Sequence, residues 1–227
     1  MPRKSSLDTS MRAREFRGRL LRWFRRHGRD LPWRRTRDPY HVLVSEVMLQ
    51  QTQVSRVEDY YRRFLERYPS LAELAAAPPA QVRESWEGLG YYRRAANLQK
   101  LAQVVTAEHG GIIPDDPARL LLLPGVGRYT AGAVASFAYE RRTPAVDTNV
   151  ARVLRRAFHP RAAGTAGERR IWATAERLIP RRRASAWAFN QGIMELGALV
   201  CTARVARCEA CPVRSACVTG QRSVRQT

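Results

Sequence analysis

The sequence contains no apolar run long enough to cross a membrane as a helix, and its basic N-terminus lacks the apolar stretch of a secretory signal. It also contains no strand-like alternation of useful length and no internal repeat. These absences exclude the membrane, secreted and repeat-protein classes. Apolar residues recur instead at helical spacing, so we predict an all-α protein of the cytoplasm, with no membrane partner.

The predicted helices occupy most of the chain, and its polar, basic first part, Met1–Arg14, is expected to be a loose arm. The principal helices expected are Glu15–His27, His41–Val57, Tyr60–Tyr68, Ala95–His109, Thr148–Phe158, Glu168–Ile179 and Ala184–Val200. With 227 residues, the chain is long enough for one large domain or for two small lobes with cores of their own.

Cysteine is scarce and confined to one place. The four cysteines are Cys201, Cys208, Cys211 and Cys217. A disulfide framework would spread them over the fold, so their clustering indicates a reduced, intracellular metal site. Zinc and iron–sulfur clusters both accept four thiolates. A single close pair within one compact loop favours a cubane [4Fe–4S] cluster over the paired knuckles of a zinc ribbon.

Acidic residues are outnumbered two to one. The chain has 40 Lys and Arg against 20 Asp and Glu, a formal net charge of +20, and nearly all the basic residues are arginine. Arginine suits phosphate better than lysine does. A charge of this size favours a polyanionic partner, and nucleic acid is the main candidate.

The segment around Pro124–Arg128 has the composition of a phosphate-binding turn. Gly125 and Gly127 flank Val126, and a run of small residues with good helix propensity, Thr130–Ala138, follows. The glycines therefore stand at a helix N-terminus, where free N–H groups and the helix dipole attract an anion.

Asp147 follows Gly127 by twenty residues, directly before the predicted helix Thr148–Phe158. Its ordinary role there is to cap the helix N-terminus. A catalytic role is the alternative, and the two are compatible because a cap also holds the carboxylate in place.

Glu46 is the only acidic residue in the predicted helix His41–Val57, and apolar residues flank it. Either its carboxyl group faces solvent, or it lies in a desolvated pocket where it can stay protonated. The polar patch Gln50–Gln53 that follows carries amide and hydroxyl groups able to contact base edges.

The turn Gly88–Arg94 combines Leu89, which we expect to be exposed, with two tyrosines and two arginines. This is the composition of a wedge that enters a base stack, with cations for the phosphates behind it. The alternative is a turn whose apolar and aromatic side chains pack into the core.

These segments together resemble the MutY adenine DNA glycosylases of the helix-hairpin-helix superfamily, from about Leu31 to Val218. The segments that carry the resemblance are Leu31–Arg34, Val44–Val54, Trp86–Tyr92, Leu123–Gly127, Val146–Asp147 and the cysteine spacing. The same cysteine spacing is found in the endonuclease III and MutY branches, so the resemblance implies a [4Fe–4S] cluster.

The resemblance implies a fold of two helical lobes with the active site in the cleft between them. Residues 31–146 would form a six-helix barrel with the helix-hairpin-helix. Residues 147–227 would form the cluster lobe, with the cluster loop at 201–217. Residues 1–30 would form an N-terminal arm and helix that packs with the cluster lobe.

The resemblance also implies roles for individual residues. Glu46 is the expected general acid, Asp147 the catalytic aspartate, Tyr129 its supporting tyrosine, and Asn149 a residue near the aspartate. The expected DNA contacts are Gln51, Thr52, Leu89, Gly90, Tyr91, Gly125, Val126, Gly127, Arg128, Arg204 and Arg207, and the expected cluster ligands are the four cysteines.

Tyr129 distinguishes between branches of the superfamily. Bifunctional endonuclease III relatives carry a lysine just after the hairpin, which forms an imine and cleaves the strand. Here Arg128 precedes a tyrosine, which cannot form an imine, so we predict a monofunctional hydrolase. Glu46 would protonate N7 of an extruded adenine, and an ionised Asp147 would stabilise the sugar cation before water adds.

The expected substrate is double-stranded DNA with adenine opposite 8-oxoguanine or guanine, bound by a monomer at the nucleoid. Typical MutY enzymes continue into a Nudix-like domain that recognises 8-oxoguanine. This sequence stops about ten residues after Cys217, so we expect that domain to be absent.

Two other functions stay open at this stage. One is a thymine or uracil glycosylase for T:G or U:G mismatches, as in archaeal enzymes with a tyrosine after the hairpin. Ser45–Glu46 and Gln50–Thr52 favour adenine. The other is a DNA-binding module without activity, which would have no use for a carboxyl group in an apolar helix.

Overall fold

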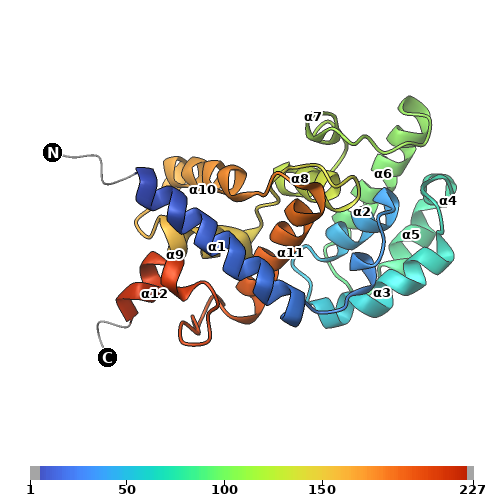
Figure 1. Ribbon diagram of the computed structural model, residues 1–227. Coiled ribbons are helices and arrows are strands. Elements are labelled where there is room, and N and C mark those ends of the chain that lie inside the picture. The colour runs from blue at the N-terminus through green and yellow to red at the C-terminus, as the bar shows by residue number, and fades with distance from the viewer. Residues whose placement is uncertain (1–5, 224–227) are drawn as a thin grey trace. The chain divides into compact units, whose positions relative to one another are not determined.

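The computed structural model describes residues 6–223, and these contain helices and turns but no β-strand, only an isolated bridge between Cys201 and Ala206. The prediction of an all-α fold is confirmed. The chain divides into two compact units, coloured by residue number in Figure 1. We call Asp30–Arg141 the central unit. The terminal unit is formed from the two ends of the chain, up to Arg29 and from Arg142 onward.

The terminal unit is organised around the packing of α1 on α11. Its elements are α1 (Ser6–His27), α9 (Thr148–Phe158), α10 (Gly164–Leu178), α11 (Arg183–Leu199), η2 (Arg214–Ala216) and α12 (Val218–Ser223). Phe16, Leu20 and Phe24 recur every four residues along α1 and are buried. They form the apolar stripe that a helix needs in order to pack on its neighbours. Helix α9 also packs on α11, and its N-terminus is thereby held in place.

The central unit is built around α2, which is buried over most of its length and packs on α8 and α3. Its elements are η1 (Pro32–Arg34), α2 (Pro39–Met48), α3 (Val54–Arg67), α4 (Leu71–Ala76), α5 (Pro79–Ser85), α6 (Arg93–Glu108), α7 (Pro117–Leu120) and α8 (Arg128–Phe137). Asp38 caps α2 through bonds from the Tyr40 and His41 amides at 2.8 and 3.1 Å, and Pro39 occupies its first turn.

Two expectations about the helices were wrong. The residues from Ser6 to Arg14 belong to α1 rather than to a loose arm, because arginine, methionine and alanine are good helix formers; residues 1–5 of the expected arm lie outside the described residues. The single helix expected over His41–Val57 is broken after Met48 and resumes at Val54. Gln51, in the break, has a left-handed φ of 58°.

None of the helices in residues 6–223 has the length and apolar character needed to span a membrane.

Candidate functional site

Glu46 lies on α2 with its carboxyl group buried, and only 5% of the residue is exposed. Tyr129, in the first turn of α8, donates its hydroxyl to Glu46 Oε2 at 2.5 Å. The packing of α8 on α2 brings the two side chains together from positions 83 residues apart. A short hydrogen bond to one carboxyl oxygen fixes the orientation of the group. Of the two readings of Glu46, the structure supports the desolvated one.

Asp147 is the N-cap of α9, as its sequence position indicates. Its Oδ1 accepts from the Val150 amide at 2.7 Å, and its Oδ2 accepts from Asn149 Nδ2 at 2.8 Å. Burial raises the pKa of the Asp147 carboxyl, although these two hydrogen bonds and the nearby charge of Arg152 act to lower it. The carboxylate is therefore held in one orientation in a partly desolvated place.

Arg152 connects this pair to the cysteine loop. Its Nη2 donates to Asn149 Oδ1 at 2.6 Å and to the Gly197 carbonyl at 2.8 Å, and its Nε donates to the Cys201 carbonyl at 2.8 Å. Gly197 allows α11 to approach, because an added Cβ would stand 2.7 Å from Asn149 Cβ. One guanidinium group thus orients the amide that bonds Asp147.

The hairpin before α8 has the geometry that its glycines predict. Gly125 has a φ of +75°, and a Cβ there would stand 2.8 Å from Asn97 Cβ, so a glycine is required on both counts. Gly127 is the N-cap of α8 and, like Gly125 and Arg128, is exposed. Exposed amides at the start of a helix offer donors to an anion such as phosphate.

The two turns expected to enter a base stack differ in what they expose. Gln51 and Tyr91 are exposed, Tyr91 by 61%, and Thr52 and Gly90 are half-buried. The expectation of an exposed Leu89 was wrong, because the residue is 6% exposed. The left-handed φ of 73° at Gly90 and 50° at Tyr91 turns the chain so that the leucine packs inward and the tyrosine faces solvent.

The four cysteines are free and line one hollow of about 320 Å³, counting the part that is open to solvent, together with Arg156, Arg207 and Arg214. N–H donors are directed at two of the four sulfurs. Arg156 Nη1 lies 3.3 Å from Cys201 Sγ, and the Gly220 amide nitrogen lies 3.3 Å from Cys217 Sγ. Burial raises the pKa of Cys211 to about 11 and also raises that of Cys217. Within residues 6–223, no three His, Cys, Asp or Glu side chains are grouped so as to hold one metal ion.

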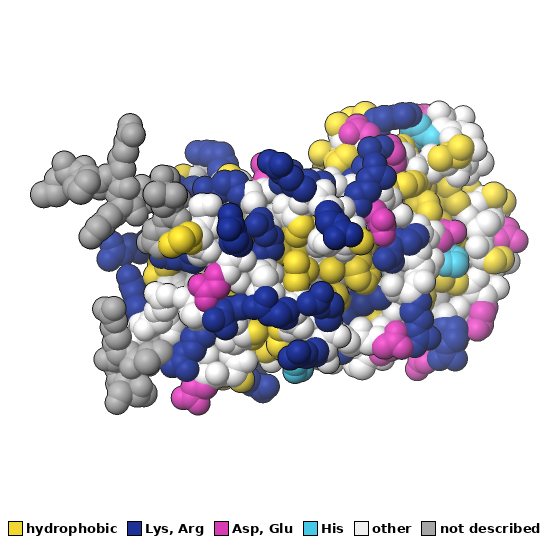
Figure 2. Space-filling model, viewed as in Figure 1, with side chains coloured by type: hydrophobic (Ala, Val, Ile, Leu, Met, Phe, Trp, Pro, Cys, Tyr) yellow, Lys and Arg dark blue, Asp and Glu magenta, His cyan; other side chains and the backbone are white. Residues whose placement is uncertain are grey.

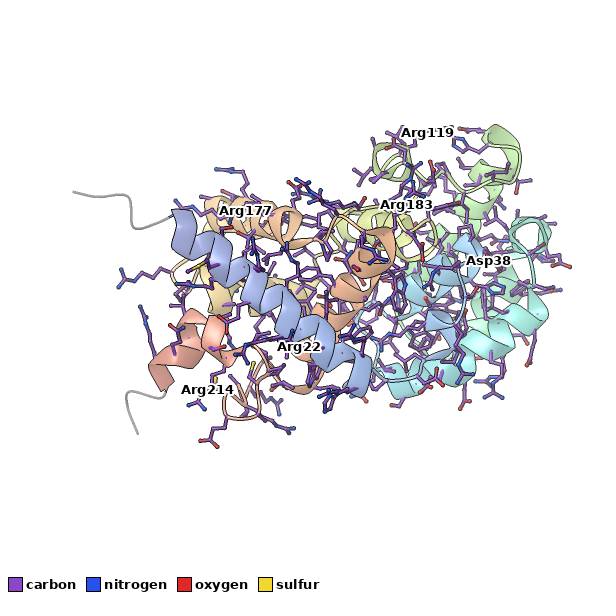
Figure 3. All side chains as sticks on the ribbon, in the orientation of Figure 1. Arg22, Asp38, Arg119, Arg177, Arg183 and Arg214 are labelled. Carbon is purple, nitrogen blue, oxygen red and sulfur yellow. The ribbon has the colours of Figure 1, made fainter. Side chains whose placement is uncertain are left out.

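Nearly all the excess charge belongs to the terminal unit. That unit has 26 Lys and Arg against 7 Asp and Glu, whereas the central unit has 14 against 13. In Figure 2, dark-blue side chains gather over α1, and magenta ones are more frequent over α3 to α5. Figure 3 labels four of the arginines on α1, α10, α11 and η2 of the terminal unit, namely Arg22, Arg177, Arg183 and Arg214. Arg204 and Arg207 are exposed on the cysteine loop.

The structure thus gathers Glu46 with Tyr129 in the central unit, and Asp147 with Asn149 in the terminal unit. Two residues that matter here, Arg152 and Arg94, were not predicted from the sequence. Arg152 lies on the same helix face as Asn149, three residues on, and that spacing was the available signal. Nothing in the sequence distinguished Arg94 from its neighbour Arg93.

Comparison with known proteins agrees with this geometry. The family described as HhH-GPD superfamily base excision DNA repair protein matches residues 44–180. The chain is 47% identical to the adenine DNA glycosylase of Homo sapiens over 91% of its length, but spans only 40% of that protein. It is 48% identical to the adenine DNA glycosylase of Mycolicibacterium smegmatis, covering 86% of this chain and 66% of that protein.

Solved structures show the same fold. A thermostable thymine-DNA glycosylase aligns with a TM-score of 0.85 and 31% identity, covering 94% of this chain and 99% of that one. Endonuclease III in a trapped covalent intermediate with DNA aligns with a TM-score of 0.80 and 27% identity, covering 95% and 98%. From these matches and the residues described above, the chain belongs to the HhH-GPD superfamily of base excision DNA repair proteins and carries a domain of the MutY type.

Proposed function

We propose that this protein is a monofunctional DNA glycosylase that removes adenine opposite 8-oxoguanine or guanine and leaves an abasic site. The observation that carries the proposal is the buried Glu46 carboxyl group bonded by Tyr129. An inert DNA-binding module gains nothing from a buried carboxyl group, because an anion weakens binding to DNA. The adenine DNA glycosylases matched by the sequence support the choice of base.

Proton donation is assigned to Glu46. Because its Oε2 accepts the Tyr129 hydroxyl, the acidic proton of Glu46 resides on Oε1, from which it transfers to N7 of the extruded adenine. Protonation makes the base a better leaving group as the glycosidic bond breaks. Proton transfer of this kind typically contributes about 10²- to 10⁴-fold to a rate.

Charge stabilisation is assigned to Asp147 and its partner Asn149. The departing base leaves an oxocarbenium-like sugar, which a carboxylate stabilises before water adds. The hydrogen bonds from Val150 and Asn149 favour the ionised form that this role requires. The only two lysines are Lys4 and Lys100, and Tyr129 follows the hairpin, so strand cleavage through an imine at that position is not expected.

Binding of duplex DNA is assigned to four segments. The amides of Gly125–Arg128 would hold a phosphate, and Arg204 and Arg207 would pair with other phosphates. Gln51 and Thr52 would contact the opposite base, and Tyr91 would fill the stack that adenine leaves. The DNA-bound endonuclease III structures of the same fold support a duplex partner. We further propose that the protein acts as a monomer on nucleoid DNA.

The four cysteines would hold a [4Fe–4S] cluster. No three of the described side chains are grouped to hold one metal ion, but in a [4Fe–4S] cluster each cysteine binds its own iron. Four free thiols around one hollow, with N–H donors directed at two of the sulfurs, fit such a group. When bound, the cluster would cross-link the loop that carries Arg204 and Arg207 and would take no part in the reaction. A visible absorption band that is lost on oxidation, with iron near four per chain, is the expected result; colourless protein holding zinc would contradict it.

An excision panel tests the base. Duplexes with adenine opposite 8-oxoguanine, guanine or cytosine, and with thymine or uracil opposite guanine, are incubated with the protein and then cleaved by alkali. Product from the first two duplexes is expected. The similarity to the thymine-DNA glycosylase makes thymine excision the second candidate, and product only from the T:G and U:G duplexes would establish it. No alkali-labile product from any duplex would contradict both.

A further inference from the structure

Arg94 is a buried cation that the reaction described above does not use. It lies in the first turn of α6 and is 9% exposed. Its Nη1 donates to the carbonyls of Val47, Met48 and Gln50 at 3.0, 2.8 and 2.5 Å. Its Nη2 donates to Thr52 Oγ1, the Leu89 carbonyl and the Gly90 carbonyl at 3.2, 3.2 and 3.1 Å.

These acceptors belong to two separate turns. Nη1 bonds carbonyls at the end of α2 and at the start of the break Leu49–Gln53. Nη2 bonds Thr52 in that break and also two carbonyls of the turn Gly88–Tyr92. The guanidinium group also lies 5.5 Å from the ring centroids of Trp86 and Tyr91. A planar group with several N–H donors in fixed directions can join two turns in this way, and a lysine ammonium cannot reproduce that geometry.

The two turns are strained where Arg94 holds them. Only three non-glycine residues in the described part of the chain have a positive φ, and two of these are Gln51 at 58° and Tyr91 at 50°. Such conformations persist only where the surrounding structure enforces them. Both residues are exposed, so burial of their side chains in the core does not enforce these conformations. The carbonyl bonds from Arg94 are the constraint common to both turns.

We propose that Arg94 is a positioning residue that joins the Gln51–Thr52 turn and the Gly90–Tyr91 turn into one rigid DNA-reading element. This inference rests on the proposed function, because it takes those turns as the parts that enter the base stack. Its consequence is that the residue facing the opposite base and the residue filling the vacated stack move together. Adenine extrusion then depends on a side chain that touches neither base.

Hydrogen exchange tests, without any substrate, whether Arg94 joins the two turns. In Arg94→Lys, amides in both turns, 49–53 and 88–92, are expected to exchange faster, and by similar factors. The matched control is Gln99→Met, because Gln99 is 5% exposed on the same helix and donates to the carbonyls of Leu74 and Ala77, outside both turns. In the control, the two turns are expected to exchange as in the wild type. Acceleration in one turn only, in neither, or equally in the control overturns the proposal.

The wild-type chain provides a measurement that does not depend on a variant folding. Amides of the two turns are expected to open in one event, with the same dependence on denaturant and temperature. Independent opening of the two turns would overturn the proposal that Arg94 joins them.

Excision supplies the functional readout. In Arg94→Lys we expect the single-turnover rate constant on an adenine:8-oxoguanine duplex to fall about 10²-fold, the size of effect that a misplacement of about 1 Å produces. Affinity for an undamaged duplex should stay within about threefold, since the phosphate contacts that dominate nonspecific binding are untouched. A rate equal to that of Gln99→Met overturns the positioning role. If the wild type excises no base at all, the proposed function fails. The exchange measurements still test whether Arg94 joins the two turns.

Discussion

The two units of this protein each hold one carboxyl group that the proposed reaction uses, and the two groups differ in their hydrogen-bond partners. In the central unit, which has almost no net charge, Glu46 is buried and accepts a hydrogen bond from the neutral Tyr129 hydroxyl. In the strongly basic terminal unit, Asp147 accepts two N–H groups and lies near the Arg152 charge. In the proposed reaction, this difference in hydrogen-bond partners is the reason for assigning proton donation to Glu46 and charge stabilisation to Asp147.

The largest effects are expected from neutralising each carboxyl group, which tests the roles assigned to the two. Glu46→Gln and Asp147→Asn should each lower the single-turnover excision rate by about 10²-fold or more. Asparagine caps helices about as well as aspartate, so Asp147→Asn should keep its melting temperature within a few degrees. Rates near wild type in either variant would contradict the assigned roles, and loss of rate only together with unfolding would leave Asp147 as a cap alone.

A smaller effect is expected from Arg152→Met. Without the guanidinium group, the Asn149 amide loses the partner that orients it toward Asp147. Loss of one charge-assisted hydrogen bond is worth at least about 1.5 kcal/mol, so excision should slow about tenfold or more. Arg155→Met is the control, because Arg155 is exposed on the same helix, three residues from Arg152. Equal rates in the two variants would show that the link to Asn149 is without effect.

The difference in charge between the units predicts where the salt dependence of DNA binding originates. Arg204→Gln and Arg207→Gln, in the terminal unit, should each weaken binding by a few-fold on any duplex and reduce the slope of log K against log salt by about 1. Arg62→Gln is the control in the central unit, since Arg62 is already paired with Asp59. A larger change of slope in the control would contradict the assignment of DNA phosphates to the terminal unit.

The smallest expected effect is on stability against pH. Burial raises the pKa of Asp147, so between its ordinary value and the raised one the folded chain binds more protons than the unfolded chain. The contribution of Asp147 to stability is therefore complete at the acid end of this window and declines as pH rises through it. Denaturant melts across acidic pH should show this slope in wild type and its absence in Asp147→Asn. The excision rate should rise over the same window, as the carboxylate forms.

Much of this arrangement could be predicted from the sequence, because its signals are local. The glycines of the hairpin, the cap at Asp147 and the periodicity of the helices each depend on neighbouring residues. The break after Met48 could not be predicted in this way, since 49–53 contains neither glycine nor proline. It is held by Arg94, which lies 44 residues away from Gln50. The burial of Leu89 and the bond from Tyr129 to Glu46 likewise depend on tertiary packing.

The terminal unit is made of segments that the ribosome synthesises far apart in time. Helix α1 packs Leu20 and Phe24 on Gly192 of α11, and the whole central unit is translated between the two helices. The apolar stripe of α1 therefore stays exposed in the nascent chain, while Asp30–Arg141, which is contiguous, can already fold. Production of this protein should thus be sensitive to chaperone supply and to translation speed before Arg183–Leu199 emerges, and slow steps in biogenesis belong to the unit that holds Asp147.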